Sequence, residues 1–155
     1  MDAKALSAAA GIEVGTLNAW ISRGYVPDIT PDAQGRRRDF DVDIATHVVI
    51  MAELSVFGFG PPSATKTASD ACEALMGNHP AYHGRSCPFA LVTRLGQKVA
   101  TMQLACASEE ALFKVLGGMV ESSIYLVINT GRIFKKMKKA EDEWQQRRKK
   151  TSGED

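Results

Sequence analysis

Apolar residues near the start of the chain recur at helical spacing in two short runs. The first run is Leu6, Ala9 and Ala10, and the second is Leu17, Trp20 and Ile21. Gly11 lies between the runs and permits the positive φ angle that a tight turn often requires. The pattern therefore predicts a helix, a turn and a second helix that begins near Gly15 or Thr16.

The predicted second helix has an exposed face of short side chains. Its members are Gly15, Thr16, Asn18, Ala19 and Ser22. We expect Ile12 and Val14 to fill the space between the two helices. A helix with so little side-chain bulk can lie close to a grooved surface, and the major groove of DNA is one such surface. The same pattern also suits a plain helical hairpin within a protein core.

Two further helices are predicted in this part of the chain. Residues 41–57 carry apolar side chains over a wide face, and Asp41 or Asp43 can cap the start of this helix. His47 lies within that face, where we expect a buried histidine satisfied by a hydrogen bond. Ser63 can cap a fourth helix with small residues along its apolar side.

The pattern changes after the sequence Gly-Asn-His-Pro at 77–80. Apolar and alternating runs predict strands at 89–93, 99–106 and 123–129 and helices at 108–116 and 132–150. The resulting order is strand, strand, helix, strand, helix, so we expect a small ββαβα domain and an α+β protein. Because three strands leave exposed edges, we expect this second domain to bind a second copy of the chain or to pack on the helical half. Its expected role is dimerisation or effector binding.

The predicted domain boundaries follow this change of pattern. We expect a helical domain at 1–76, a linker at 77–80 and a small α+β domain at 81–150 that ends in a basic helix. Residues 151–155 are predicted to form a disordered tail.

Positive charge is concentrated in two places although the net charge is only +1. Arg36, Arg37 and Arg38 are consecutive, and residues 132–150 contain nine basic and three acidic side chains. Local clusters of this kind bind phosphate even when the whole protein is nearly neutral. The C-terminal cluster is either a solvated helix surface or an auxiliary phosphate-binding helix.

Cysteine and histidine positions give little support for a metal site. Three cysteines in a chain without a recognisable signal peptide predict reduced thiols. Cys72, His79, His83 and Cys87 supply enough donors for zinc, but their spacing lacks the close Cys-x2-Cys pair of specific zinc motifs. We therefore treat these four residues as weak candidates and expect neither a metal nor another cofactor.

The chain also lacks the patterns of common enzymes and membrane proteins. It contains no phosphate-binding glycine loop, nucleophile elbow or distinct carboxylate pair, so we expect no enzymatic activity. No stretch approaches the roughly 18 uninterrupted apolar residues of a membrane helix. These features predict a cytoplasmic protein without a membrane partner.

Four short motifs occur in sequence in the first part of the chain. They are Gly-Ile-Glu-Val-Gly-Thr-Leu-Asn-Ala-Trp at 11–20, Gly-Tyr-Val-Pro at 24–27, Arg-Asp-Phe at 38–40 and Phe-Gly-Phe-Gly at 57–60. In this order they resemble the DNA-binding domain of the MerR family over residues 2 to about 76. The first motifs also resemble small excisionase-type helix-turn-helix proteins of phages.

Two features depart from the MerR pattern. Asn18 stands where the family usually has Arg, and Ala19 stands where the family has an aromatic residue that touches DNA. No long heptad run follows residue 76, although the family ends this domain in a coiled-coil helix. The resemblance therefore implies a DNA-binding fold but gives neither the base preference nor the mode of dimerisation.

The resemblance implies a four-helix MerR-like winged helix-turn-helix and a sequence-specific DNA-binding transcriptional regulator. The expected DNA-binding residues are Thr16, Asn18, Ala19, Ser22, Arg23, Arg36, Arg37 and Arg38. Trp20 and Phe40 are expected to support the fold rather than touch DNA. The expected partners are double-stranded DNA, a second copy of the chain in a homodimer and, for a regulator, RNA polymerase.

Other functions remain open on the sequence. An architectural DNA-binding protein of a phage or mobile element, such as an excisionase or a small packaging subunit, suits the same motifs. A protein-interaction module suits the helical pattern without any DNA. A metal or ligand sensor is a further alternative.

Overall fold

The computed structural model describes residues 1–27, 29, 39–76, 89–95, 98–103, 109–118 and 125–152. The chain forms two compact units. Unit 1 comprises Met1–Thr65 together with Ile133–Asp155, and unit 2 comprises Lys66–Arg132. Unit 2 is therefore inserted into the sequence of unit 1, and the chain passes between the units within a helix each time.

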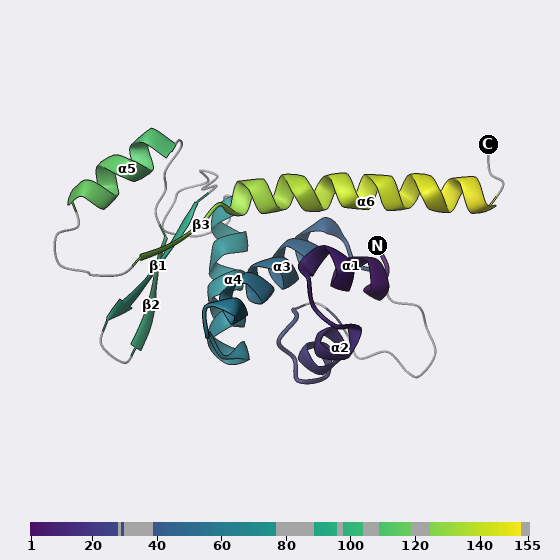
Figure 1. Ribbon diagram of the computed structural model, residues 1–155, viewed down its shortest axis with the longest axis horizontal. Helices are drawn as coiled ribbons and strands as arrows, with labels where there is room; N and C mark the ends of the chain where they lie inside the picture. The colour runs from purple at the N-terminus through teal and green to yellow at the C-terminus, as the bar shows by residue number, and fades with distance from the viewer. Residues whose placement is uncertain are drawn as a thin grey trace. The chain divides into compact units, whose positions relative to one another are not determined.

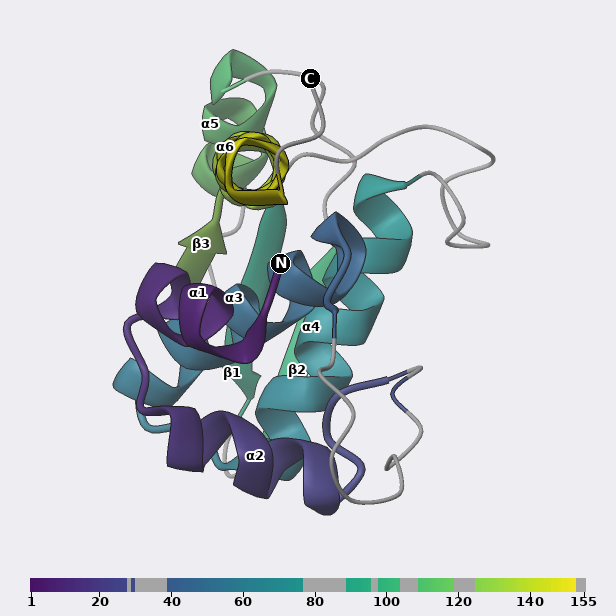
Figure 2. The same ribbon diagram turned by 90° about the vertical axis from the view of Figure 1, so that its right-hand side faces the viewer.

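Unit 1 consists of helices over its described residues (Figure 1). It contains α1 (Ala3–Ala10), α2 (Val14–Ser22), α3 (Val42–Val56), the first residues of α4 (Pro61–Leu75) and most of α6 (Thr130–Ser152). In both views α1 and α3 lie between α2 and α6 (Figures 1 and 2). Helices α2 and α6 therefore occupy opposite sides of this unit.

Side-chain oxygens fix the starts of three helices. Asp2, Asp41 and Asn129 each accept a hydrogen bond of 2.8–2.9 Å from the backbone N–H three residues later. Helix α4 begins differently, because Pro61 occupies its first position, where a missing N–H leaves no bond unmade. Ser63, which we predicted as the cap of this helix, consequently lies inside it.

A glycine with positive φ follows each of the first three helices. The φ angles are +68° at Gly11, +72° at Gly24 and +81° at Gly58. At each position, the N–H of the glycine and that of the next residue bond to carbonyls three and five residues earlier. This double bond pattern satisfies the last carbonyls of the helix and turns the chain sharply, so α2 follows α1 after only three residues.

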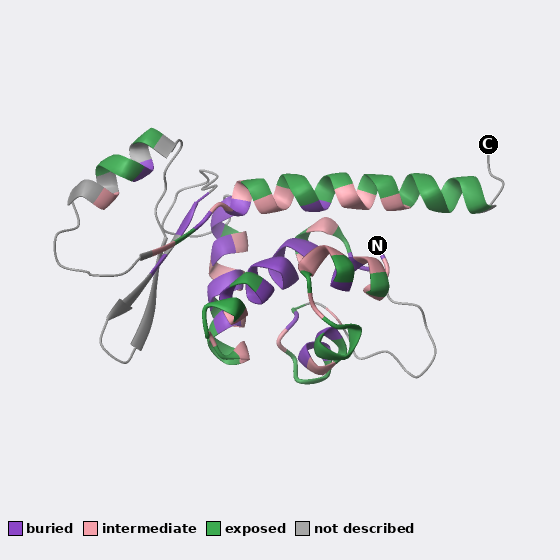
Figure 3. Ribbon diagram, viewed as in Figure 1, coloured by how far each residue is buried: buried purple, intermediate pink, exposed green. Residues whose placement is uncertain are grey.

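The core of unit 1 lies where α1 and α2 pack against α3. Its buried side chains include Leu6, Leu17, Trp20, Ile21, Val26, Phe40, Val48, Ile50, Met51 and Leu54. Residues 45–52 of α3 are all buried, as Figure 3 shows, which confirms the wide apolar face predicted for this helix. Met137 of α6 is also fully buried.

Unit 2 contains the remainder of α4 and three short strands. Strand β1 (Ala90–Leu95) lies between β2 (Lys98–Gln103) and β3 (Tyr125–Ile128) and pairs antiparallel with both. Helix α5 (Glu109–Gly118) connects β2 to β3. The buried apolar residues of this unit include Ala68, Ala71, Phe89, Val92, Leu112 and Ile128.

The predicted α+β class is wrong. Most described residues lie in helices, whereas the strands have six, six and four residues, so the protein is mostly helical. The ββαβα domain is wrong as well, because α6 belongs to unit 1 from Ile133 onward and leaves no closing helix for such a domain. Periodicity in the sequence identified an apolar side of this helix but not the unit on which that side packs.

One detail of the helix-turn-helix prediction also fails. Val14 is 39% exposed and does not fill the space between α1 and α2. It is the first residue of α2 and precedes the part of the helix that packs on the core. Ile12 is half-buried, and the expected supports Trp20 and Phe40 are both buried.

Candidate nucleic-acid interface

Helix α2 presents short side chains to solvent. Leu17, Trp20 and Ile21 are buried, and the rest of the helix carries Val14, Gly15, Thr16, Asn18, Ala19 and Ser22. All of these are exposed except Ala19, which is half-buried, and exposed Arg23 follows the helix directly. Thr16, Asn18, Ala19, Ser22 and Arg23 are the residues predicted to contact DNA here. All five lie outside the core and can contact a partner.

The start of α2 has no side-chain cap. Glu13 occupies the N-cap position, but its carboxylate accepts no hydrogen bond from the helix. The first helical hydrogen bond joins the N–H of Leu17 to the Glu13 carbonyl at 3.2 Å. The N–H groups of Gly15 and Thr16 come before this bond, so they have no acceptor within the helix. Such N–H groups carry partial positive charge and suit a phosphate oxygen. The exposed carboxylate of the N-cap residue Glu13 acts against this attraction, so the helix start is not by itself an anion-binding site.

A buried polar cluster fixes the chain immediately after α2. The Tyr25 carbonyl accepts a hydrogen bond from the Thr65 hydroxyl and lies 3.2 Å from Nε2 of His47. A carbonyl can only accept, so the geometry assigns the proton of His47 to Nε2. The cluster joins the end of α2 to α3 and α4, and it confirms the buried, hydrogen-bonded histidine that the sequence predicts.

Burial also sets the charge of His47. Its side chain is buried, and this burial lowers the pKa below the ordinary value of 6.5, while the hydrogen bond to Tyr25 acts in the opposite direction. The imidazole is therefore neutral at pH 7. At the start of α3, burial and then the neighbouring Asp41 raise the pKa of Asp43.

The residues directly after the predicted wing are anchored from two sides. The Met1 nitrogen donates to the Phe40 carbonyl at 2.5 Å, and the Phe40 N–H donates to the Met1 carbonyl at 2.7 Å. From α6, a guanidinium nitrogen of Arg148 lies 3.2 Å from a carboxylate oxygen of Asp39. The Arg148 guanidinium also lies 5.3 Å from the centre of the Trp144 ring. Both the start of the chain and α6 therefore hold this segment.

These anchors line a groove of about 610 Å³ in unit 1. Its walls are Met1, Asp39, Phe40, Asp41, Glu141, Trp144, Gln145, Arg148 and Lys149. Acidic and basic side chains both contribute, and the ion pair of Asp39 with Arg148 lies among them. The groove therefore offers no single sign of charge that would select a ligand, and it is best described as the seam along which α6 packs.

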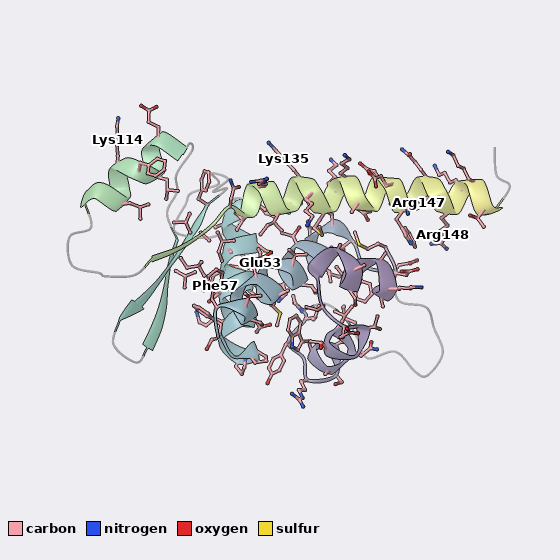
Figure 4. The ribbon with its side chains drawn as sticks, in the orientation of Figure 1. Glu53, Phe57, Lys114, Lys135, Arg147 and Arg148 are labelled. Carbon is pink, nitrogen blue, oxygen red and sulfur yellow. The ribbon has the colours of Figure 1, made fainter. Side chains whose placement is uncertain are left out.

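The exposed side of α6 carries a concentration of positive charge. Its exposed cations in unit 1 are Lys135, Lys136, Lys138, Lys139, Arg147, Arg148, Lys149 and Lys150. Glu143 neutralises part of this charge, because its carboxylate lies 4.0 Å from Lys139 and 3.8 Å from Arg147. Lys135 extends away from α1 and α3, whereas Arg148 extends toward the side on which α1 lies (Figure 4).

Several predicted site residues lie outside the described residues. These are Arg36, Arg37 and Arg38 of the wing and His79, His83 and Cys87 among the weak metal candidates. Cys72 is half-buried on α4. Within the part of the chain that the structure describes, no three His, Cys, Asp or Glu side chains gather as metal ligands.

Arg148 is the contributor that the sequence prediction missed. The sequence predicts an apolar stripe on the last helix, with its lysines facing outward, and assigns no contact to Arg148. Arg148 follows Trp144 by four residues, which places the two on the same side of the helix. That spacing was visible in the sequence, but its partner Asp39 is 109 residues away and was not.

Two further observations bear on the class of the protein. No described helix combines the length and the apolar character that a membrane span requires. The sequence matches no family model and no curated protein.

Proposed function

We propose that this chain is a sequence-specific DNA-binding protein that regulates transcription, with α2 lying in the major groove of double-stranded DNA. The observation that carries the proposal is the exposed surface of α2, where Gly15, Thr16, Asn18 and Ser22 follow Val14 with little side-chain bulk. The chain turns sharply at Gly11, and α1 and α3 lie on the side of α2 that faces the core. This arrangement is the one that a helix-turn-helix protein uses to bring its second helix to base edges.

The proposal assigns roles to Thr16, Asn18 and Ser22 of α2 and to Arg23, which follows the helix. Thr16 donates to a phosphate oxygen, and Arg23 contacts the backbone electrostatically. Ser22 exchanges the hydrogen bond that its hydroxyl donates to the Ala19 carbonyl, at 3.1 Å, for one to a phosphate oxygen. The amide of Asn18 can form two hydrogen bonds with adenine in the major groove, so it is the proposed base-reading residue. Arg36, Arg37 and Arg38 are proposed to hold a wing on the backbone or in the minor groove, as the MerR resemblance implies.

Selection of bound duplexes from a random pool tests this proposal. Wild-type protein should enrich a defined site, and a two-fold symmetric site would support the proposed homodimer. Asn18→Ala should lose the preference for adenine at one position of each half-site. The discrimination lost should be about 5- to 150-fold, which corresponds to about 1–3 kcal/mol for a bidentate contact.

Arg38→Ala is the matched variant for the phosphate contacts. It should weaken binding to all sequences alike and leave the adenine preference intact, because a phosphate contact carries no base information. If wild-type protein enriches no sequence at low salt, the proposal of sequence-specific DNA binding is rejected. An enriched site that is identical for wild type and Asn18→Ala would reject the assignment of Asn18.

A further inference from the structure

A lysine cluster lies on the side of unit 1 that faces away from α2. It consists of Lys135, Lys136, Lys138 and Lys139 on α6, and all four side chains are exposed. The layer formed by α1 and α3 separates α6 from α2 in both views (Figures 1 and 2). The lysine cluster and the α2 surface therefore cannot be parts of one continuous face.

Most of the charge of the lysine cluster is uncompensated. Among the described residues, Lys135, Lys136 and Lys138 have no carboxylate within 4.0 Å, and Lys139 has a single contact with Glu143 at that limit. Four lysines within five residues give a dense positive charge on flexible side chains, which suits phosphates spaced along a polymer.

The distance between the two faces excludes a shared contact with one straight duplex. A helix with its side chains is about 10 Å across, so three layers of helices place the outer faces of α2 and α6 roughly 30 Å apart. DNA is stiff over roughly 150 base pairs, and wrapping one short duplex around the whole unit would require strong bending. A second segment of DNA meets the lysine cluster without such bending.

We propose that the lysine cluster binds the phosphate backbone of a second DNA segment while α2 holds the first, so that one molecule bridges two duplexes. The proposal rests on the proposed function for the first segment. It gives the protein an architectural role in addition to site recognition. The contact at α6 is electrostatic and independent of sequence, because lysine side chains offer point charges rather than the paired donors that read bases.

The chemistry of α6 favours DNA over a lipid surface. Helices that lie on membranes place large apolar side chains in the lipid and cations in the headgroup region. The described residues with large exposed apolar side chains are Val14, Val56, Phe57, Met76, Phe113 and Val127, and none of them belongs to α6. The apolar stripe of α6 instead includes the fully buried Met137. A surface on which cations outnumber the three acidic residues Glu141, Asp142 and Glu143, and which has no exposed apolar anchor, suits a phosphate polymer better.

Capture of a second duplex by a bead-bound duplex tests bridging. The bead-bound DNA carries the selected site, and the labelled second duplex lacks it. Lys135→Gln combined with Lys136→Gln should reduce capture at least about fivefold and leave affinity for the first duplex within about twofold. Lys66→Gln combined with Lys114→Gln is the control, because it removes the same charge from α4 and α5 and should leave capture unchanged. Equal capture by all three proteins would overturn the proposal.

A second measurement keeps this inference separate from the proposed function. Thr16→Glu combined with Ser22→Glu places carboxylates on α2 and should abolish site recognition by repelling phosphate. This variant should still bind nonspecific duplex, with an affinity that falls steeply as salt rises. Adding the Lys135→Gln and Lys136→Gln changes should remove that residual binding. If the variant with only Thr16→Glu and Ser22→Glu showed no residual binding, the inference would be overturned, even if wild-type α2 recognises its site as proposed.

Two other outcomes would replace DNA with another partner at α6. Vesicles of phosphatidylserine may be offered to the protein in place of the second duplex. Binding to these vesicles that depends on Lys135 and Lys136, without capture of duplex, would assign the lysine cluster to a membrane surface. Preferential capture of polyglutamate over duplex at equal salt would assign it to an acidic protein. Either result overturns the bridging proposal.

Discussion

Helices α2 and α6 both expose a polar surface of unit 1, but the two surfaces are built from opposite kinds of side chain. The surface of α2 has short and mostly uncharged residues, with Arg23 at its end. The surface of α6 has long lysine and arginine side chains. Short side chains allow a helix backbone to come close and form directed hydrogen bonds, whereas long cations attract phosphate over a distance and without directional preference.

Under the proposed assignment of α2 to the DNA groove, charge alone is a poor guide to the surface that reads a sequence. Counting cations would select α6 as the nucleic-acid site and would pass over α2. The proposed division of work is recognition by shape and hydrogen bonds at α2 and salt-dependent attraction at α6. Three changes within the chain can break or sharpen this division.

The largest expected effect comes from replacing the tryptophan of each helix, Trp20 in α2 and Trp144 in α6. Trp20 is only 6% exposed, so Trp20→Ala should lower the free energy of unfolding by about 3–5 kcal/mol. Trp144 on α6 is half-buried, and Trp144→Ala should cost only about 1–2 kcal/mol. Thermal and urea unfolding measure both changes. Equal losses in the two variants would show that α2 is not supported more firmly than α6.

Smaller effects, of opposite sign to each other, are expected at Gly15 in α2 and at Gly24, which follows this helix. A Cβ added at Gly15 or Gly24 meets no atom within 4 Å, so only backbone preference decides the outcome. Gly15→Ala should stabilise the protein by about 1 kcal/mol, because alanine favours a helix. Gly24→Ala should destabilise it by about 1–2 kcal/mol, because φ at this position is +72°.

The same pair tests whether α2 must approach DNA closely. Gly15 lies on the exposed surface of α2, so Gly15→Ala should weaken site-specific binding although it stabilises the fold. Gly24→Ala should leave the affinity of the folded protein nearly unchanged, since this residue ends the helix. Unchanged affinity in Gly15→Ala would contradict a close helix–groove contact at that position.

The smallest expected effect is a pH dependence of the unfolding free energy that arises from His47, which is hydrogen-bonded to Tyr25 after α2. The pKa of His47 is lowered in the folded state, so the unfolded state binds a proton first as the pH falls below about 6.5. The stability that neutral His47 provides is fully present above that value and is lost progressively toward the lower folded pKa. His47→Gln should flatten this part of the curve of unfolding free energy between pH 7.5 and 5.5.

The α6 surface gives the internal control for this pH dependence. Helix α6 contains no histidine, so nonspecific DNA binding by α6 should not follow the loss that involves His47. A loss of stability between pH 7.5 and 5.5 that is the same in wild type and His47→Gln would assign the effect to another group.

The sequence predicted local structure well wherever a signal lies within one or two helical turns. Gly11 marked the turn after α1, and Asp41, one of two predicted caps, starts α3. His47 was placed correctly because an apolar helix face surrounds it. These predictions needed only periodicity and capping, which depend on neighbours in the chain.

The sequence could not supply the partners of distant segments. Asp39 and Arg148 are 109 residues apart, and neither position alone indicates the other. The assignment of α6 to a ββαβα domain failed for the same reason, since its apolar stripe could suit either unit. Of the candidate site, the surface of α2 was predictable from spacing, whereas its opposition to the lysine cluster required the arrangement of α1 and α3.

The division of unit 1 into two separate stretches of sequence has a consequence for how the protein folds during synthesis. Residues 1–65 leave the ribosome first, but Ile133 and the helix that follows emerge only after all of unit 2. Until then, Asp39 lacks its ion pair with Arg148 and the seam along α6 is open. During synthesis, unit 1 therefore remains incomplete until the inserted residues of unit 2 have been translated. The later packing of α6 then joins two parts of unit 1 that are separated by a long loop.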